Sequence, residues 1–176
     1  MSGHNKWSKI KRQKEKTDGQ KSKIFGKMVK LITTEARKAN GNLKSPGLQN
    51  AIEKAKAVNV PSDNIERAIK KSTEAGVAME SITYEAYGPG GCGLIIETLT
   101  DNHNKAAQEI KHILSEQGFA LAGIGSVKWA FERLPGMEWN PTTTIPLSET
   151  DGSALGELID ALEECDEVQD VFTNAE

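Results

Sequence analysis

The first third of the chain carries apolar residues at the spacing of amphipathic helices. From Ser22 onward they recur every three or four positions, while charged residues fall between them. The apolar positions are Ile24, Phe25, Met28, Leu31, Ile32 and Ala36. Asn40-Gly41 is a typical end for such a helix, and shorter segments with the same period follow Pro46 and Pro61. The pattern predicts a small domain of three helices over residues 22–72.

The periodicity changes after residue 80. Residues 82–87 alternate between apolar and polar side chains and residues 94–99 form a compact apolar run, so both are predicted strands. Helical stripes and further strand-like segments follow, in the order β-β-α-β-β-α-β. The later strands are expected at residues 126–131, 142–147 and 168–172. This order predicts an α+β fold: a ferredoxin-like α/β sandwich, in which a split βαββαβ unit is preceded by an extra hairpin strand.

Two segments have no clear period. Residues 1–21 contain many lysines and few apolar groups, so burial cannot offset the entropy lost on ordering them. We expect a basic flexible arm there and a linker over residues 73–80. The predicted organisation is an arm at 1–21, a helical domain at 22–72, the linker, and a sandwich domain at 81–176.

The charge divides the chain near the same place. Residues 1–71 hold 18 Lys/Arg against 6 Asp/Glu, a net +12, and residues 72–176 hold 4 against 19, a net −15, which sums to the −3 of the whole chain. A Lys/Arg-rich domain is typical of proteins that neutralise phosphates. The basic part therefore indicates a nucleic-acid partner.

The arm is the strongest candidate for that contact. Its cations are dense enough for several phosphate contacts, and Trp7 could stack on an unpaired base. The cations are Lys6, Lys9, Lys11, Arg12 and Lys14. The alternative is a solubilising basic tail, with Trp7 folded against the first helix.

Further candidate binding residues lie on the polar faces of the predicted helices. The first and third helices offer Lys27, Lys30, Arg37, Lys38, Arg67, Lys70 and Lys71. Lys105 falls in the first turn of a later helix, where a cation opposes the helix dipole, so it could serve a ligand. An ordinary surface lysine is the alternative at that position.

Catalytic and cofactor chemistry is not indicated. Gly88–Gly93 matches G-x-G-x-x-G, but a strand follows it, so a dinucleotide site would lack its helix N-terminus. His103 and His112 fall on opposite faces of one helix, and His4 lies in the arm. We therefore expect a non-enzymatic protein with no catalytic residue, metal, cofactor or small-molecule substrate.

Membrane and secretory signals are not indicated either. Apolar runs are only a few residues long, as in Leu94-Ile95-Ile96, too short to span a bilayer. The basic N-terminus has no apolar segment behind it. Cys92 and Cys165 lie far apart without a paired spacing, which suggests reduced thiols. We expect a cytoplasmic protein with no membrane partner.

Several motifs resemble those of the YebC/PmpR family. They are Gly3–Trp7, Pro61–Lys71, Tyr84–Gly91, Thr100–Asn102 and Asp166–Ala175, and the likeness covers nearly the whole chain. The resemblance implies a non-enzymatic regulator of gene expression. Some members are described as DNA-binding transcriptional regulators. Relatives, including the mitochondrial translational activator of cytochrome oxidase subunit I, act on ribosomes, and bacterial ones are linked to relief of stalling. The binding surface implied by the resemblance is His4, Lys6, Trp7, Lys11, Lys14, Lys23, Arg67 and Lys70.

The chain departs from the family pattern in one large way. Members usually insert a further α/β domain between the strand at Phe131–Arg133 and the one at 142–147, and here only Leu134–Asn140 joins them. Three function classes stay open: a duplex-DNA transcription regulator, an RNA- or ribosome-binding translation factor, and a protein-protein adaptor. Contacts dominated by lysine favour binding to the nucleic-acid backbone with low sequence specificity, and this slightly favours RNA as the target. The family descriptions favour DNA.

Overall fold

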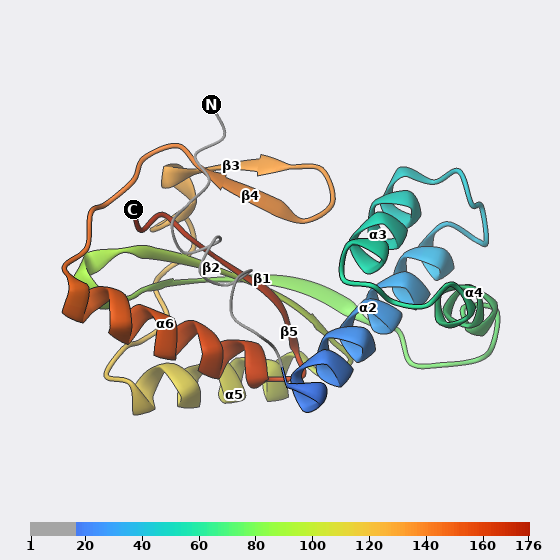
Figure 1. The fold of residues 1–176 in the computed structure, drawn as a ribbon, viewed down its shortest axis with the longest axis horizontal. Helices are drawn as coiled ribbons and strands as arrows, with labels where there is room; N and C mark the ends of the chain where they lie inside the picture. Colours follow the sequence, from blue (N-terminus) through green and yellow to red (C-terminus); the bar gives the residue numbers. More distant parts are fainter. Residues whose placement is uncertain (1–16) are drawn as a thin grey trace. The chain divides into compact units, whose positions relative to one another are not determined.

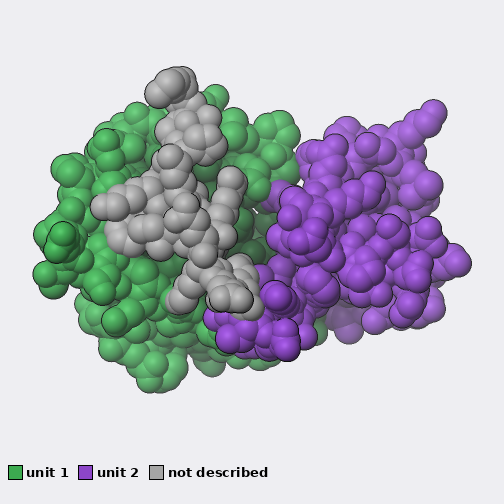
Figure 2. Space-filling model, in the orientation of Figure 1, with its two compact units in different colours: residues 1–15, 80–176 green, residues 16–79 purple. Residues whose placement is uncertain are grey.

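The computed structural model describes residues 17–176 and divides into two compact units. A helical unit lies within residues 16–79 and a sandwich unit within residues 80–176 (Figure 2). Each unit has its own buried apolar residues.

The helical unit consists of the three helices that the apolar spacing predicts. They are α2 (Asp18–Lys38), α3 (Pro46–Ala57) and α4 (Ser62–Lys71) (Figure 1). Its core is built from small and branched residues of all three helices. The buried apolar residues are Leu31, Ile32, Ala36, Leu48, Ala51, Ala55, Val60, Ile65 and Ala68.

Helix α2 starts earlier than the sequence pattern indicates. Thr17 and Gln20 form a capping box: the Thr17 hydroxyl accepts the Gln20 N–H at 3.3 Å, and Gln20 Oε1 accepts the Thr17 N–H at 2.9 Å. Residues 18–21, expected in the arm, are therefore the first turn of the helix. The apolar period missed this turn because its side chains are polar or glycine.

The sandwich unit has the predicted element order and is an α+β fold. Its strands are β1 (Glu80–Tyr87), β2 (Gly93–Thr100), β3 (Phe131–Leu134), β4 (Glu138–Pro141) and β5 (Val168–Thr173). Its α-helices are α5 (His103–Glu116) and α6 (Glu149–Glu164), with short 3-10 turns at Pro89–Gly91 and Lys128–Ala130.

Strands β1, β2 and β5 form one antiparallel sheet with β2 in the centre. All eight residues of β2 are buried, because strands flank both of its edges and other elements cover both of its faces. Helices α5 and α6 lie side by side on one face (Figure 1). The core between them and the sheet includes Leu94, Ile96, Ile110, Leu114, Leu155, Leu158, Leu162 and Val171.

The opposite face carries the hairpin of β3 and β4, and here two predictions were wrong. The strand expected at 126–131 begins only at Phe131, because the 3-10 turn at Lys128–Ala130 occupies the preceding residues. The strand expected at 142–147 contributes only one parallel bridge, from Ile145 to Ala175. Since β3 pairs with β4 alone, the sheet has three strands and is not the complete four-stranded sheet of a ferredoxin-like fold.

The glycine-rich Gly88–Gly93 segment is a hairpin connection, as predicted. It joins the paired strands β1 and β2, and Gly90 has a φ of +68°. This left-handed conformation favours glycine, and a Cβ there would also lie 2.5 Å from the end of the Leu147 side chain, which would have to shift.

Asn174 links the C-terminal segment to the sheet and generates a stability prediction. Its side chain is buried, accepts the Gly93 N–H at 2.7 Å and donates to the Thr143 carbonyl at 3.0 Å. Replacing it with Ala removes both bonds, of which the one to the Gly93 N–H is buried, so we expect Asn174→Ala to lower the free energy of unfolding by about 1–3 kcal/mol. Urea unfolding followed by circular dichroism measures this change.

The matched control is Asn104→Ala on the exposed surface of α5, which should stay within about 0.5 kcal/mol of the wild type. Equal stabilities of the two variants would contradict the assigned role of Asn174.

Candidate nucleic-acid interface

Seven of the predicted binding residues lie outside the described residues and stay predictions. They are His4, Lys6, Trp7, Lys9, Lys11, Arg12 and Lys14. The other predicted residues lie on α2, α4 and α5, and their surroundings differ considerably.

The lysines of α2 do not form one solvent-facing row. Lys23 is exposed and Lys30 is half-buried, whereas Lys27 is only 8 % exposed. Lys27 lies three residues after Ile24 and four before Leu31, so it shares the side of the helix on which they lie. Its assignment to the solvent face was therefore wrong.

Arg37 contacts the main chain of the helical unit. Its guanidinium donates to the carbonyls of Ser72 at 3.4 Å, Val77 at 3.2 Å and Glu74 at 3.4 Å. These acceptors include the C-cap of α4 and the segment after it. Arg37 therefore joins α2 to the chain that follows α4, a role that its position on a polar helix face did not reveal.

Contacts between α2 and α4 bring the C-terminal halves of the two helices together. Thr33 on α2 donates to the Ala68 carbonyl at 3.2 Å, and four residues later Arg37 reaches Ser72. The C-terminal ends of both helices thus lie at the same end of the unit. Cations there also interact favourably with the helix dipoles.

We call the exposed cations at this place the basic end: Lys38, Arg67, Lys70 and Lys71. Lys38 forms an ion pair with Glu35 at 3.1 Å, and its side chain remains 55 % exposed. The structure thus brings together residues that are about 30 positions apart in the sequence. Helix α3 also ends in basic residues, Lys54 and Lys56, which the sequence analysis left out although they fall in its last turn.

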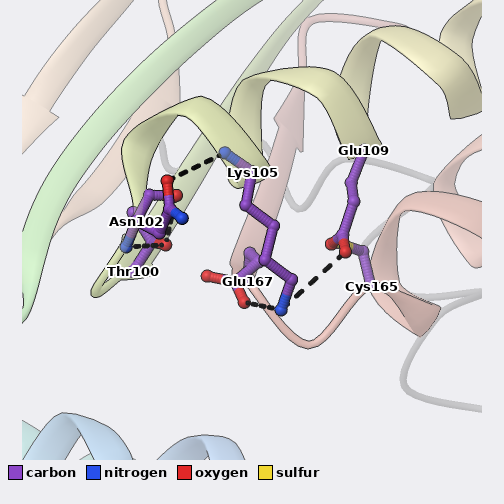
Figure 3. A network of polar contacts seen from close by, with 6 residues as sticks. All are labelled: Thr100, Asn102, Lys105, Glu109, Cys165 and Glu167. Atoms are coloured by element: carbon purple, nitrogen blue, oxygen red, sulfur yellow. Dashed lines mark hydrogen bonds and ion pairs between the residues drawn. The ribbon is translucent and has the colours of Figure 1, made fainter.

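Lys105 is placed among carboxylates of the sandwich unit. Its ammonium lies 3.2 Å from Glu167 Oε1 and 3.9 Å from Glu109 (Figure 3). The hydrogen bond with Glu167, together with the attraction of Glu167 and Glu109, raises the pKa of Lys105. Asn102 caps this helix by accepting the Lys105 N–H at 3.2 Å. Since Glu167 is buried, Lys105 has a structural role as its counter-ion.

Cys165 extends the same network. Its thiol donates to Glu109 Oε2 at 3.2 Å (Figure 3), and burial raises its pKa. The network therefore joins α5 to the residues between α6 and β5.

Neither a metal-binding cluster nor a membrane-spanning helix is found among the described residues. Within residues 17–176, no three or more His, Cys, Asp or Glu side chains are arranged to hold a metal ion. No helix in that range is long and apolar enough to cross a bilayer.

Comparison with family models assigns both units to one family. Residues 5–75 match the model of the TACO1/YebC protein N-terminal domain, and residues 79–135 and 134–175 match that of the TACO1/YebC second and third domain. The chain belongs to the TACO1/YebC family. The YebC resemblance inferred from the sequence motifs is thereby confirmed.

Curated TACO1/YebC relatives are named as regulators. A probable transcriptional regulatory protein of Petrotoga mobilis is 51 % identical over 136 residues, which cover 76 % of this chain and 54 % of the relative. One from Fervidobacterium nodosum is 44 % identical over 171 residues, covering 96 % of this chain and 68 % of the relative. The chain thus spans about half to two thirds of the length of such relatives.

A solved structure supports the fold. The crystal structure of a conserved hypothetical protein from Aquifex aeolicus has a TM-score of 0.81 with 29 % identity, and covers 97 % of this chain and 96 % of that one. The TACO1/YebC model of the second and third domain matches in two segments that meet at residues 134–135. This is the start of the β3–β4 connection, where the sequence motifs place the departure from the family pattern.

The Arg37 contacts predict a difference between two neighbouring cations of α2. We expect Arg37→Ala to lower the free energy of unfolding of the helical unit by about 1–3 kcal/mol, because it removes charge-assisted bonds to three carbonyls. Lys38→Ala should change it by less than about 0.5 kcal/mol, since it removes only an exposed ion pair. Urea unfolding monitored by helical circular dichroism compares the two, and similar losses would refute the special role of Arg37.

The Lys105 contact predicts a pH dependence. The folded-state pKa of Lys105 is raised above its ordinary value of 10.5, so its stabilising contribution is complete below about pH 10.5 and is lost as the pH rises through the folded-state pKa. We expect Lys105→Met to lower the melting temperature at neutral pH, and the difference from wild type to shrink above about pH 10.5. Thermal unfolding across pH 7–12, with the exposed Lys111→Met as control, measures this; a difference that persists at pH 12 would exclude the ion pair as its cause.

Proposed function

We propose that this chain is a nucleic-acid-binding regulator of gene expression, and the distribution of charge along it carries the proposal. Residues 1–16 hold 6 Lys/Arg against 1 Asp/Glu, residues 17–79 hold 12 against 6, and residues 80–176 hold 4 against 18. Phosphates are therefore bound by the arm and the helical unit, with the basic end supplying contacts from a rigid support. On this proposal the protein acts in the cytoplasm and catalyses no reaction.

The binding is directed mainly at the nucleic-acid backbone. Helices α3 and α4 are joined by a short turn, which is reminiscent of a helix-turn-helix pair. However, the first half of α4 carries the exposed acids Asp63 and Glu66, and its cations lie towards the C-terminal end. Acids at that position repel phosphates where a recognition helix would enter the groove, so α4 is not proposed to read bases.

Duplex DNA is the first candidate target, because the relatives are named probable transcriptional regulatory proteins. RNA, including ribosomal RNA, is the second. It is favoured by contacts that are dominated by lysine and need no groove-reading helix. Since the chain spans only part of those relatives, the activity of a whole relative is transferred here as part of the proposal.

The role of the arm can be tested by charge reversal. We expect Lys6→Glu, Lys11→Glu and Lys14→Glu together to reduce affinity by orders of magnitude, and to lower the slope of log affinity against log salt by about 2.7 for three duplex phosphate contacts. Fluorescence anisotropy with a DNA duplex and a ribosomal RNA fragment, at several salt concentrations, measures both quantities.

A control variant makes the same change in net charge at other positions of the chain. Lys44→Glu, Lys111→Glu and Arg133→Glu together alter three exposed cations outside the predicted binding set, two of them on the sandwich unit. Equal losses from the two triple variants would show that only total charge matters and would remove the arm from the proposal. Crosslinking in cells, with sequencing of both nucleic acids, then separates the targets: promoter DNA supports transcription and ribosomal RNA supports translation.

A further inference from the structure

The loop that precedes β3 exposes large apolar side chains in an otherwise acidic unit. Ile124 is 97 % exposed and Trp129 is 68 % exposed, and Tyr87, at the end of β1, is 48 % exposed. We call Tyr87, Ile124 and Trp129 the apolar loop face. An exposed cluster of this kind on a soluble unit usually marks a contact surface.

The loop is held in a fixed shape by a buried carboxylate. Glu85 is 4 % exposed, and its two oxygens accept the main-chain N–H groups of Gly125, at 2.5 Å, and of Lys128, at 2.9 Å. The Glu85 carbonyl also accepts the Ala122 N–H at 2.8 Å. Gly125 has a φ of +87°, which lets the chain turn between these bonds. Ile124 is therefore presented by a braced loop.

The two rings are oriented by one shared acceptor. The Ser126 carbonyl accepts the Tyr87 hydroxyl at 2.9 Å and the Trp129 Nε1–H at 2.8 Å. Because the polar atoms of both rings point to this carbonyl, their exposed surface is mostly ring carbon. Such surface suits stacking contacts and offers few groups for hydrogen bonds to a partner.

The distribution of charge around the apolar loop face favours a nucleic-acid partner. Residues 117–131 contain no Asp or Glu, although the sandwich unit holds 18 acids in residues 80–176. The same stretch contains Lys128, one of only four Lys/Arg in the unit. A polyanion is repelled by most of the unit but can approach this stretch.

We propose that the apolar loop face is a stacking site for unpaired nucleobases of RNA or single-stranded DNA. The inference rests on the proposed function, because the arm and the basic end supply the phosphate contacts. Base–aromatic stacking requires an open base face, which a duplex does not offer. Trp129 and Tyr87 supply the aromatic surface and Ile124 adds apolar contact, whereas the Lys128 ammonium lies over the Trp139 ring, 6.0 Å from its centroid.

The test measures binding of the full chain to fluorescent oligo(rA), oligo(dA) and a DNA duplex. Trp129→Ala should weaken binding of both single strands by roughly 5- to 150-fold, because one stacked base contributes about 1–3 kcal/mol. Duplex affinity and the salt slope should not change, since no phosphate contact is removed. Trp129→Phe should restore most of the affinity. Oligo(rA) and oligo(dA) together show whether the site prefers RNA.

Two further variants exclude indirect effects. Ile124→Ser alters a side chain with almost no buried surface, so it should keep the fold and still weaken single-strand binding. Leu134→Ala, at another exposed apolar residue of the unit, should have no effect.

Each remaining outcome has a definite meaning. Unchanged single-strand affinity in Trp129→Ala and Ile124→Ser, with binding lost in the Lys6/Lys11/Lys14 variant, would overturn the stacking site and leave the proposed function standing. Equal losses on single strands and duplex would also overturn it. If the wild type bound none of the probes, both proposals would fail. Loss of self-association with unchanged nucleic-acid binding would assign the face to a protein contact instead.

Discussion

The sandwich unit depends on carboxylates that lie inside it and must be met by donors. Burying a carboxylate without hydrogen-bond partners is strongly unfavourable. Each buried carboxylate of this unit therefore holds in place the groups that donate to it. Glu85 holds the loop before β3, and Glu167 holds Lys105 on α5. Glu97, 1 % exposed at the centre of the sheet, accepts from Thr83 at 2.9 Å and from the Trp139 indole at 2.6 Å, which attaches β4 to the sheet. Part of the acidity of this unit is therefore internal and structural.

The sequence predicted what depends on local periodicity. The three helices, the order of strands and helices after residue 80 and the α+β class are confirmed, because apolar spacing decides which face of each element is buried. Sequence-based prediction failed where a single tertiary contact determines the position of a side chain or the pairing of a strand. The pattern could not show that Arg37 would find three carbonyls beyond α4, or that residues 131–134 would pair with 138–141. Lys27 is buried although it is a lysine, because its spacing from Ile24 and Leu31 places it on the apolar side of α2.

The β3–β4 hairpin shows how this chain closes the place where its family match divides. The two matched segments of the second- and third-domain model meet at residues 134–135. Residues 135–137 then turn directly into β4, with positive φ at Gly136 and Met137. Beneath the hairpin, Phe131 and Trp139 pack with Ile95 and Phe172 of the sheet. A turn of three residues and a small apolar cluster are thus sufficient to cover this face of β2.

The hydrogen bonds to the Ser126 carbonyl limit the sequence specificity that the apolar loop face could have. A carbonyl oxygen has two lone pairs, and the Tyr87 hydroxyl and the Trp129 indole engage both of them. A nucleobase stacked on these rings would make van der Waals contacts with them. The rings would not offer it hydrogen bonds by which one base could be distinguished from another. Such a surface is indifferent to nucleotide identity. On the proposed function, any choice among nucleic-acid targets must therefore be encoded in other parts of the molecule.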